Sequence, residues 1–246
     1  MECLKLDMVR DDLRKTIEPY LLKLLEIHHN NIISMILYGS ATGGDFSPKT
    51  SDINLLIVFH TLEFDQLKRS LKLISSGINK KIAAPLFLSR RHIDTSQDVF
   101  PIEFLEIKEN HITIFGEDLF KDMQIEQKHI RVFCEQQIKG KLIRLRQAYL
   151  EIGLKHKGVE ALMKESLYGL MPIFRALIRI SGITPMVEKE KILNQLAKNY
   201  SLDEEVFIAI LKDKKDDEKI AGCDIQVFFE KYICEIKKLA IAVDKL

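Results

Sequence analysis

The hydrophobic pattern along the chain changes its period once, near residue 120. From about residue 30 to 115, apolar runs of strand length alternate with stretches in which apolar residues recur every three or four positions. From about residue 124 onward nearly every segment has the helical period. The pattern predicts an α+β domain over residues 1–120, with a mixed sheet flanked by helices, and an all-helical bundle over residues 121–246.

The individual runs predict the elements of both domains. Apolar runs that end in polar or glycine-containing turns are typical of buried strands. In the first domain we expect helices at Leu4–His29 and Leu62–Ser76, and strands at Ile32–Tyr38, Asn54–Phe59, Ala84–Leu88, Ile102–Ile107 and His111–Phe115. In the second we expect helices at Ile125–Ile152, Gly158–Ile180 with a kink at Pro172, and Glu188–Lys198, then one opened by a capping box at Ser201–Glu204 and a last one capped by Asp224.

The turn Gly39-Ser40 follows the first predicted strand directly. A helix that begins at such a turn presents free backbone N–H groups and the positive end of its dipole to an anion. A Gly-Ser pair after a strand is by itself more often only a turn.

Asp52 and Asn54 lie at the start of the second predicted strand, separated by one residue. Strand side chains alternate between faces, so these two point the same way and are able to contact the same ion. Mg²⁺ prefers oxygen ligands and is usually completed by water and phosphates. Asn54 supplies a carbonyl oxygen but no charge, which matters most if two divalent ions must bind close together.

Tyr38-Gly39-Ser40, followed by Ser51-Asp52-Ile53-Asn54 and the apolar run to Phe59, resembles the signature of the nucleotidyltransferase superfamily, which includes polymerase β and the aminoglycoside nucleotidyltransferases. The resemblance implies that Gly39 and Ser40 hold the phosphates of a nucleoside triphosphate and that Asp52 binds Mg²⁺ or Mn²⁺. Asn54 stands where the family usually has Asp, so it is implied as a neutral metal ligand.

Glu103 and Glu106 are candidates for a further carboxylate. Three residues apart on a strand, they point to opposite faces, so only one serves a given site. The resemblance favours Glu103, after Pro101-Ile102, as the residue that completes the metal site or accepts the proton of the acceptor hydroxyl. A solvent-facing glutamate or a simple salt bridge is the alternative.

Basic and aromatic residues of the helical domain are further candidates. Lys139, Lys141, Arg144 and Arg146 form the densest basic cluster, for which a solvated helix face is the main interpretation. The family often draws a lysine from its helical domain to the triphosphate, and Lys189 is the candidate, with Lys191 beside it. We expect four aromatic residues to fill the core: Tyr149, Tyr168, Phe174 and Phe228.

The composition bears on three properties: nucleic-acid binding, membrane insertion and the state of the cysteines. The 246 residues include 37 basic and 36 acidic side chains, so the net charge of +1 gives no electrostatic argument for nucleic-acid binding. No apolar run reaches the roughly 18 residues of a membrane span. The four cysteines form no C-x-x-C pair, which favours free thiols in a reducing cytosol. We expect a cytoplasmic protein, with a homodimer left open.

The resemblance implies transfer of a nucleoside monophosphate, with AMP from ATP as the first candidate, to a hydroxyl of an unidentified small-molecule or protein acceptor. The reaction would take place in a cleft between the two domains. Two alternatives stand beside it. One is a non-catalytic nucleotide-binding or regulatory protein in which Asn54 marks a degenerate metal site. The other is an interaction module like the small nucleotidyltransferase antitoxins, against which the helical half of this chain argues because those proteins are short.

Overall fold

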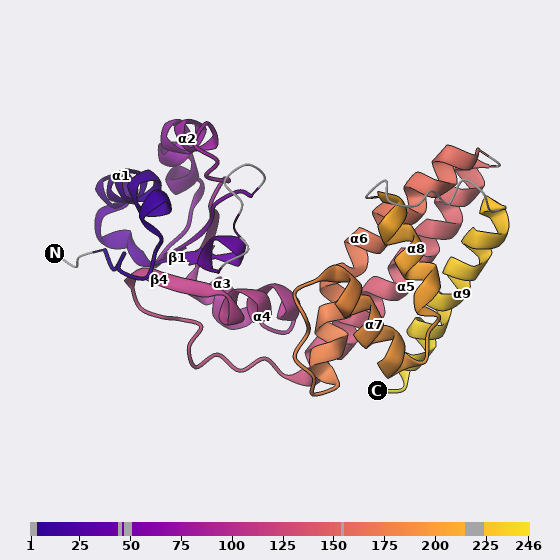
Figure 1. Ribbon diagram of the computed structural model, residues 1–246. Helices are drawn as coiled ribbons and strands as arrows, with labels where there is room; N and C mark the ends of the chain where they lie inside the picture. The colour runs from indigo at the N-terminus through magenta and orange to yellow at the C-terminus, as the bar shows by residue number, and fades with distance from the viewer. Residues whose placement is uncertain (1–3, 44–45, 47–50, 154, 215–223) are drawn as a thin grey trace. The chain divides into compact units, whose positions relative to one another are not determined.

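The computed structural model describes residues 4–43, 46, 51–153, 155–214 and 224–246 (Figure 1). The chain forms two compact units, Met1–Ile125 and Glu126–Leu246, and each is described by itself.

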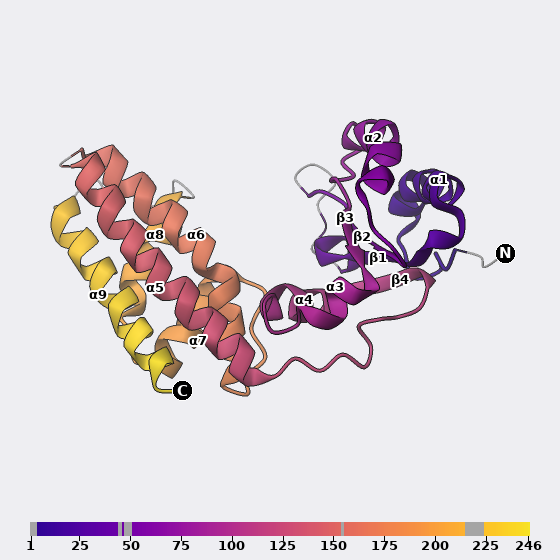
Figure 2. The same cartoon turned by 180° about the vertical axis from the view of Figure 1, so that it is seen from behind.

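The N-terminal unit is built on a mixed sheet whose strands follow the order β3-β2-β1-β4 (Figures 1 and 2). Its described strands are β1 (Ile32–Tyr38), β2 (Asn54–Phe59), β3 (Leu86–Ser89) and β4 (His111–Gly116). β1 pairs antiparallel with both β2 and β4, and β2 pairs parallel with β3. The fold class predicted from the sequence is confirmed, and β1 and β2 have the predicted bounds.

Helices cover both faces of this sheet. They are α1 (Asp11–His28), α2 (Phe64–Ile78), α3 (Arg90–Thr95) and α4 (Pro101–Glu109), with short 3₁₀ helices η1 (His29–Asn31) and η2 (Gly39–Thr42). Leu37, Leu55 and Ile57 share one buried cluster with residues of α1 and α2. Ile36 and Leu56 share the other with residues of α3 and α4. Consecutive strand residues therefore belong to opposite cores, as the alternation of strand side chains requires.

The predicted strand Ile102–Ile107 is wrong, because this segment is the helix α4. Pro101 occupies the start of the helix, where its fixed φ fits and its missing N–H costs nothing. Phe104 and Ile107, three residues apart, pack on the sheet from the same side of the helix. Glu103 and Glu106 are also three apart, so they lie on neighbouring positions of one helix side and not on opposite faces.

The starts of α1 and β3 are among the other boundaries that differ from the prediction. α1 begins at Asp11 and not at Leu4, although Leu6 and Val9 of the preceding segment are buried. β3 begins at Leu86 because Pro85 has no N–H to donate to the ladder.

The second unit is helical throughout its described secondary structure, as predicted. Its helices are α5 (Gln127–Ile152), α6 (His156–Ile180, with Pro172 inside), α7 (Lys189–Tyr200), α8 (Glu204–Lys214) and α9 (Ile225–Asp244).

The caps of two of these helices test the sequence prediction. Asp224 caps α9 by accepting a hydrogen bond from the backbone N–H of Gln226 at 3.0 Å, as predicted. The predicted role of Ser201 is wrong: it ends α7 in a left-handed conformation, with φ of 52°. Asp203 instead accepts from the N–H of Glu205 at 3.1 Å, so α8 begins later than expected.

The aromatic residues predicted for the core have mixed environments. Phe174 is fully buried and lies edge-on to Phe207. Tyr149, Tyr168 and Phe228 are only partly buried.

The described cysteines are free thiols, Cys134 buried and Cys234 exposed. Cys3 and Cys223 lie outside the described residues. Within the described ranges, no helix is both long enough and apolar enough to cross a membrane.

His28 is a buried histidine at the end of α1. Its Nε2 lies 2.8 Å from the hydroxyl of Ser70, which itself donates to the carbonyl of Gln66. The Ser70 oxygen must therefore accept from Nε2–H. Nδ1 is buried with no hydrogen-bond partner among the described residues, and the ring packs edge-on against Phe59. A neutral imidazole fits this environment and an imidazolium does not.

We expect acid to destabilise the N-terminal unit through His28. Burial, together with the charge of Arg69, holds the pKa of His28 below its ordinary value of 6.5, although Asp65 opposes this. The stabilisation is therefore complete above about pH 6.5 and declines as pH falls from there toward the folded-state pKa. His28→Gln keeps the bond to Ser70 without a titratable ring, so its melting temperature should vary less with pH in this range. Equal pH profiles for both proteins would contradict the prediction.

Candidate functional site

Three strand ends meet at one end of the sheet. Tyr38, the last residue of β1, lies in register with Asn54 on β2 and with His111 on β4. Residues in register on neighbouring strands share a face. That face is the one covered by α3 and α4, because Ile36 and Leu56, two positions along β1 and β2, belong to that core.

The Gly39-Ser40 turn leads away from this row. Gly39 has a φ of +76°, and its N–H donates to the carbonyl of Asn110 at 3.0 Å. The chain then forms only η2, in which the Thr42 hydroxyl donates to the Gly39 carbonyl at 2.8 Å. The helix expected at this turn is thus a single 3₁₀ turn, so an anion here would meet the amides of a short turn without the dipole of a long helix.

The structure brings Gly39 and Asn54 together. A Cβ atom placed on Gly39 would lie 3.4 Å from Nδ2 of Asn54, in ordinary contact. The side-chain amide of Asn54 therefore lies directly beside the backbone of the turn. Positive φ favours glycine at position 39, and the lack of a side chain there leaves room for the Asn54 amide beside the turn. A phosphate held by the turn fits this arrangement.

Asp52 and Asn54 flank Ile53, which is buried on the α1 side of the sheet. Two backbone hydrogen bonds join Ile53 to the segment around Ile82: its N–H donates to the Lys81 carbonyl at 2.8 Å, and its carbonyl accepts from the N–H of Ala83 at 3.0 Å. Asp52 is exposed and Asn54 half-buried. Asp52 forms no ion pair with another described residue, so its carboxylate is available to a cation.

The position of a further carboxylate differs from the expectation. β3, the strand beside β2, has the sequence Leu-Phe-Leu-Ser and carries no acidic residue. Glu103 is exposed in the first turn of α4. It precedes Asn110, which bonds the Gly39 turn, by seven residues, or about 10 Å along a helix axis. Glu106 and Glu109 lie closer to that end of the helix, and the proline at position 101 was the sequence signal for this placement.

The predicted metal ligands do not form a ready-made cluster. Across the described ranges, no three Asp, Glu, His or Cys side chains gather closely enough to hold a metal ion. A metal bound between Asp52 and Asn54 would take most of its ligands from phosphates and water, as Mg²⁺ commonly does. The metal-binding roles of Asp52, Asn54 and Glu103 stay predictions.

Comparison with solved structures identifies the fold. Spectinomycin adenyltransferase AAD(9) from Enterococcus faecialis, solved with ATP and spectinomycin, matches with a TM-score of 0.54. The match has 13% sequence identity and covers 91% of this chain and 99% of that one. The fold is that of a nucleotidyltransferase. A nucleotidyltransferase-like protein from Exiguobacterium sibiricum also matches, with a TM-score of 0.46 and 11% identity over 95% of this chain and 77% of that one. No family model and no curated protein sequence matches this chain.

A histidine–aspartate pair supports the row of strand ends in this nucleotidyltransferase fold. Nε2 of His111 lies 3.0 Å from Oδ1 of Asp118, and Nδ1 lies 3.1 Å from the Lys108 carbonyl. Burial raises the pKa of Asp118, but hydrogen bonds from His111 and from the amides of Phe120 and Lys121 outweigh it, so the pKa is lowered. The pair fixes the junction of α4 and β4 beside Gly39. No sequence pattern reveals this pair, because its members meet only once β4 is formed.

Tyr38 faces the same site between Asn54 and His111. Burial raises the pKa of its phenol above the ordinary value of 10.0. Its hydroxyl is therefore neutral at physiological pH and offers a hydrogen bond without adding charge.

The basic candidates of the helical unit have different surroundings. Lys139 pairs with Glu135 at 2.6 Å and with Asp244 at 3.0 Å, which joins α5 to α9. Its contacts favour a structural role. Nζ of Lys189, at the start of α7, lies 4.4 Å from the ring centroid of Tyr168. The predicted contact of Lys189 with a triphosphate stays a prediction, as does the cleft between the two domains.

Lys191 pairs with Glu188 at 2.8 Å. Arg144 and Arg146 are exposed on α5, while Lys141 is half-buried with Nζ close to Gly169. The basic cluster therefore does not converge as a unit on one site.

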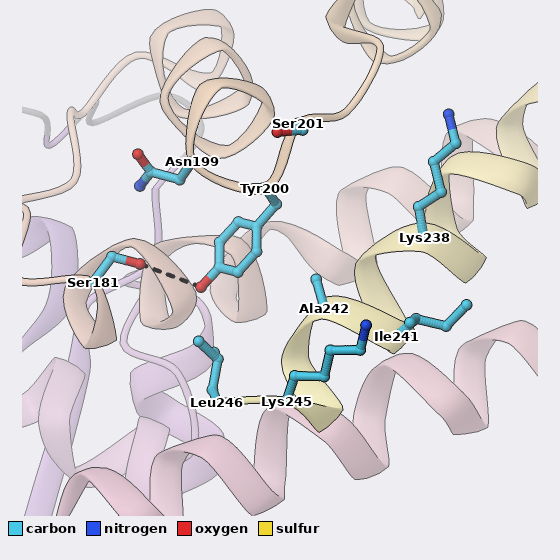
Figure 3. A pocket seen from close by; sticks show the side chains of 9 residues that line it. All are labelled: Ser181, Asn199, Tyr200, Ser201, Lys238, Ile241, Ala242, Lys245 and Leu246. Atoms are coloured by element: carbon cyan, nitrogen blue, oxygen red, sulfur yellow. Dashed lines mark hydrogen bonds between the residues drawn. The ribbon is translucent and has the colours of Figure 1, made fainter.

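A hollow of about 510 Å³ lies in the helical unit, and none of the predicted site residues line it (Figure 3). Ser181 and Tyr200, whose hydroxyls are 3.3 Å apart, line one side of it, and Lys238 and Lys245 of the α9 end line another. It is wide open, and Lys238 already pairs with Glu235. We place the candidate site at the sheet end, where the Asn54 amide lies beside the Gly39 turn and Asp52 precedes Asn54 by two residues.

Proposed function

We propose that the N-terminal unit binds a nucleoside triphosphate, with ATP as the first candidate. The observation that carries this proposal is that the Asn54 amide lies beside the Gly39 turn, where a Cβ atom on Gly39 would be 3.4 Å from Nδ2 of Asn54. In this proposal Gly39 and Ser40 hold the phosphates. Asp52 and the carbonyl oxygen of Asn54 hold one Mg²⁺ or Mn²⁺, which would neutralise phosphate charge when bound.

We further propose that the site binds its nucleotide without efficient transfer, as a regulatory or sensing domain would. Three features support this. Asn54 is neutral, β3 contributes no carboxylate, and Glu103 belongs to the first turn of α4. Two-metal transfer chemistry needs carboxylates to hold both ions close together, whereas one metal and a turn suffice for binding.

The second candidate is transfer of AMP from ATP to a hydroxyl of a small-molecule or protein acceptor. It is favoured by the fold shared with AAD(9), whose structure contains ATP and spectinomycin. In this candidate Glu103, or Glu106 one turn nearer to Asn110, accepts the hydroxyl proton, and Lys189 contacts the triphosphate. The acceptor is unidentified.

Pyrophosphate release by the wild-type protein separates the two candidates, and Asn54→Asp tests whether residue 54 belongs to the metal site. We expect the wild-type protein to release no pyrophosphate from labelled triphosphates above the rate of buffer, with Mg²⁺ or Mn²⁺ and a panel of hydroxyl acceptors. The variant gains a carboxylate beside Asp52 and should bind Mg²⁺ about tenfold more tightly, because an ionised oxygen replaces a neutral one. The measurements are pyrophosphate release and calorimetric titration of the nucleotide-bound protein with Mg²⁺.

Asn79→Asp, the same change at the exposed end of α2, is the control and should leave Mg²⁺ affinity unchanged. Pyrophosphate release by the wild type that disappears in Asp52→Ala would establish the second candidate. Unchanged Mg²⁺ affinity in Asn54→Asp would remove Asn54 from the metal site.

A further inference from the structure

A groove of about 500 Å³ runs between α5 and α9 in the helical unit. Its walls include Arg146 and Leu150 from α5 and Val227 and Glu230 from α9. Tyr149 and Phe229 stack against each other within it, with ring centroids 4.7 Å apart and planes inclined by 17°. The stacked pair of rings joins α5 to α9, so the two walls of the groove are packed against each other.

Large apolar side chains around the groove are exposed. Leu150 is 81% exposed and Val227 is 49% exposed. Ile143, one heptad before Leu150 on the same side of α5, is 57% exposed. Scattered exposed apolar residues are normal, but a cluster of them rimmed by charges is typical of an interaction site.

The two charges of the groove lie at about the same level on opposite walls. α5 and α9 are antiparallel, since Lys139 in the middle of α5 pairs with Asp244 at the end of α9, while Tyr149 near the end of α5 bonds Gln226 near the start of α9. Arg146 precedes Tyr149 by one helical turn, and Glu230 follows Phe229, which stacks on Tyr149. Neither Arg146 nor Glu230 has an ion-pair partner among the described residues.

We propose that this groove is a self-association surface whose occupant is a second copy of the chain. A twofold axis along the groove places α5 of one copy over α9 of the other. Arg146 then faces Glu230 of the partner subunit, and the symmetry repeats the pair. Leu150 meets Val227 of the partner subunit at the same time, so the apolar side chains leave water together with the formation of two ion pairs.

The charge pattern favours a second copy over an unrelated partner. A surface with one positive and one negative wall is complementary to itself under that rotation. An unrelated helix would need the same two charges in the same order. This inference concerns the helical unit alone and does not depend on nucleotide binding.

Analytical ultracentrifugation of the full chain tests the proposal. The wild type should form a dimer that dissociates on dilution. Arg146→Glu and Glu230→Arg should each weaken it by at least about tenfold, because each places like charges opposite one another twice. The double variant restores opposite charges and should dimerise within about threefold of the wild type. Lys198→Glu, a reversal at an exposed position of α7, is the control and should dimerise as the wild type does.

All three substituted positions are exposed, and circular dichroism checks that the helices are retained. The proposal is overturned if the wild type is monomeric up to about 100 µM. A dimer with a dissociation constant above that concentration would be too weak for the specific contact proposed. A dimer that neither single reversal weakens also overturns it, because the contact then lies on another surface. Failure of the double variant to recover would show that the two charges do not face each other.

Discussion

Asp52→Ala is expected to abolish the part of ATP binding that depends on a divalent metal. Asp52 carries the only carboxylate among the described residues 51–59, and Asn54 cannot replace its charge. Saturating ligand at about 100 times its dissociation constant stabilises a folded protein by about 2.7 kcal/mol. The measurement is the melting temperature with ATP, in the presence and absence of Mg²⁺. The added stabilisation from Mg²⁺ should vanish in the variant.

Asp7→Ala removes an exposed carboxylate from the same unit, in the turn before α1, and is the matched control. Its response to ATP and Mg²⁺ should equal that of the wild type. A metal-dependent stabilisation that survives in Asp52→Ala would show that residues other than Asp52 bind the metal. The assignment of the β2 start as the metal site would then be wrong.

Gly116→Ala is expected to destabilise the N-terminal unit by about 3 kcal/mol or more, among the largest effects of a single substitution. Gly116 ends β4 with a φ of +71°, and a Cβ there would lie 1.9 Å from the carbonyl oxygen of Ile33. That atom is backbone of β1, so the two strands must move apart. Urea unfolding followed through the amide proton signals of β1 and β4 measures the change in this unit.

Gly182→Ala separates backbone strain from this collision. Gly182 has a similar φ of +76°, but a Cβ there would meet no atom within 4 Å. Only the strain of the left-handed conformation remains, which is about 1 kcal/mol. Equal losses of stability in the two variants would show that the approach of β1 to Gly116 does not matter.

The strands that the sequence predicted best are short apolar runs bounded by turn residues. The run Ile32–Tyr38 and the run Asn54–Phe59 are apolar on both faces because helices cover the sheet on both sides. The segment Ile102–Ile107 was ambiguous, since its apolar residues fit both a strand and a helix. Pro101 and the packing of Phe104 and Ile107 decided for a helix.

The candidate site was only partly visible in the sequence. Asp52 and Asn54 are close in sequence, so their common direction followed from the strand period. The contact of Asn54 with Gly39 depends on the register of β1 and β2, which the sequence alone does not give. The bond from Gly39 to Asn110 and the pair His111–Asp118 depend on β4 lying beside β1, and no local pattern predicts that pairing.

Calorimetric titration of the full-length wild-type protein with ATP, with and without Mg²⁺, tests the central claim most directly. We expect one nucleotide to bind per chain, with affinity that Mg²⁺ increases and with no pyrophosphate formed during the titration. Absence of binding at millimolar ATP, about the weakest affinity a specific site would show, would contradict the claim that the Gly39 turn and Asn54 form a nucleotide site.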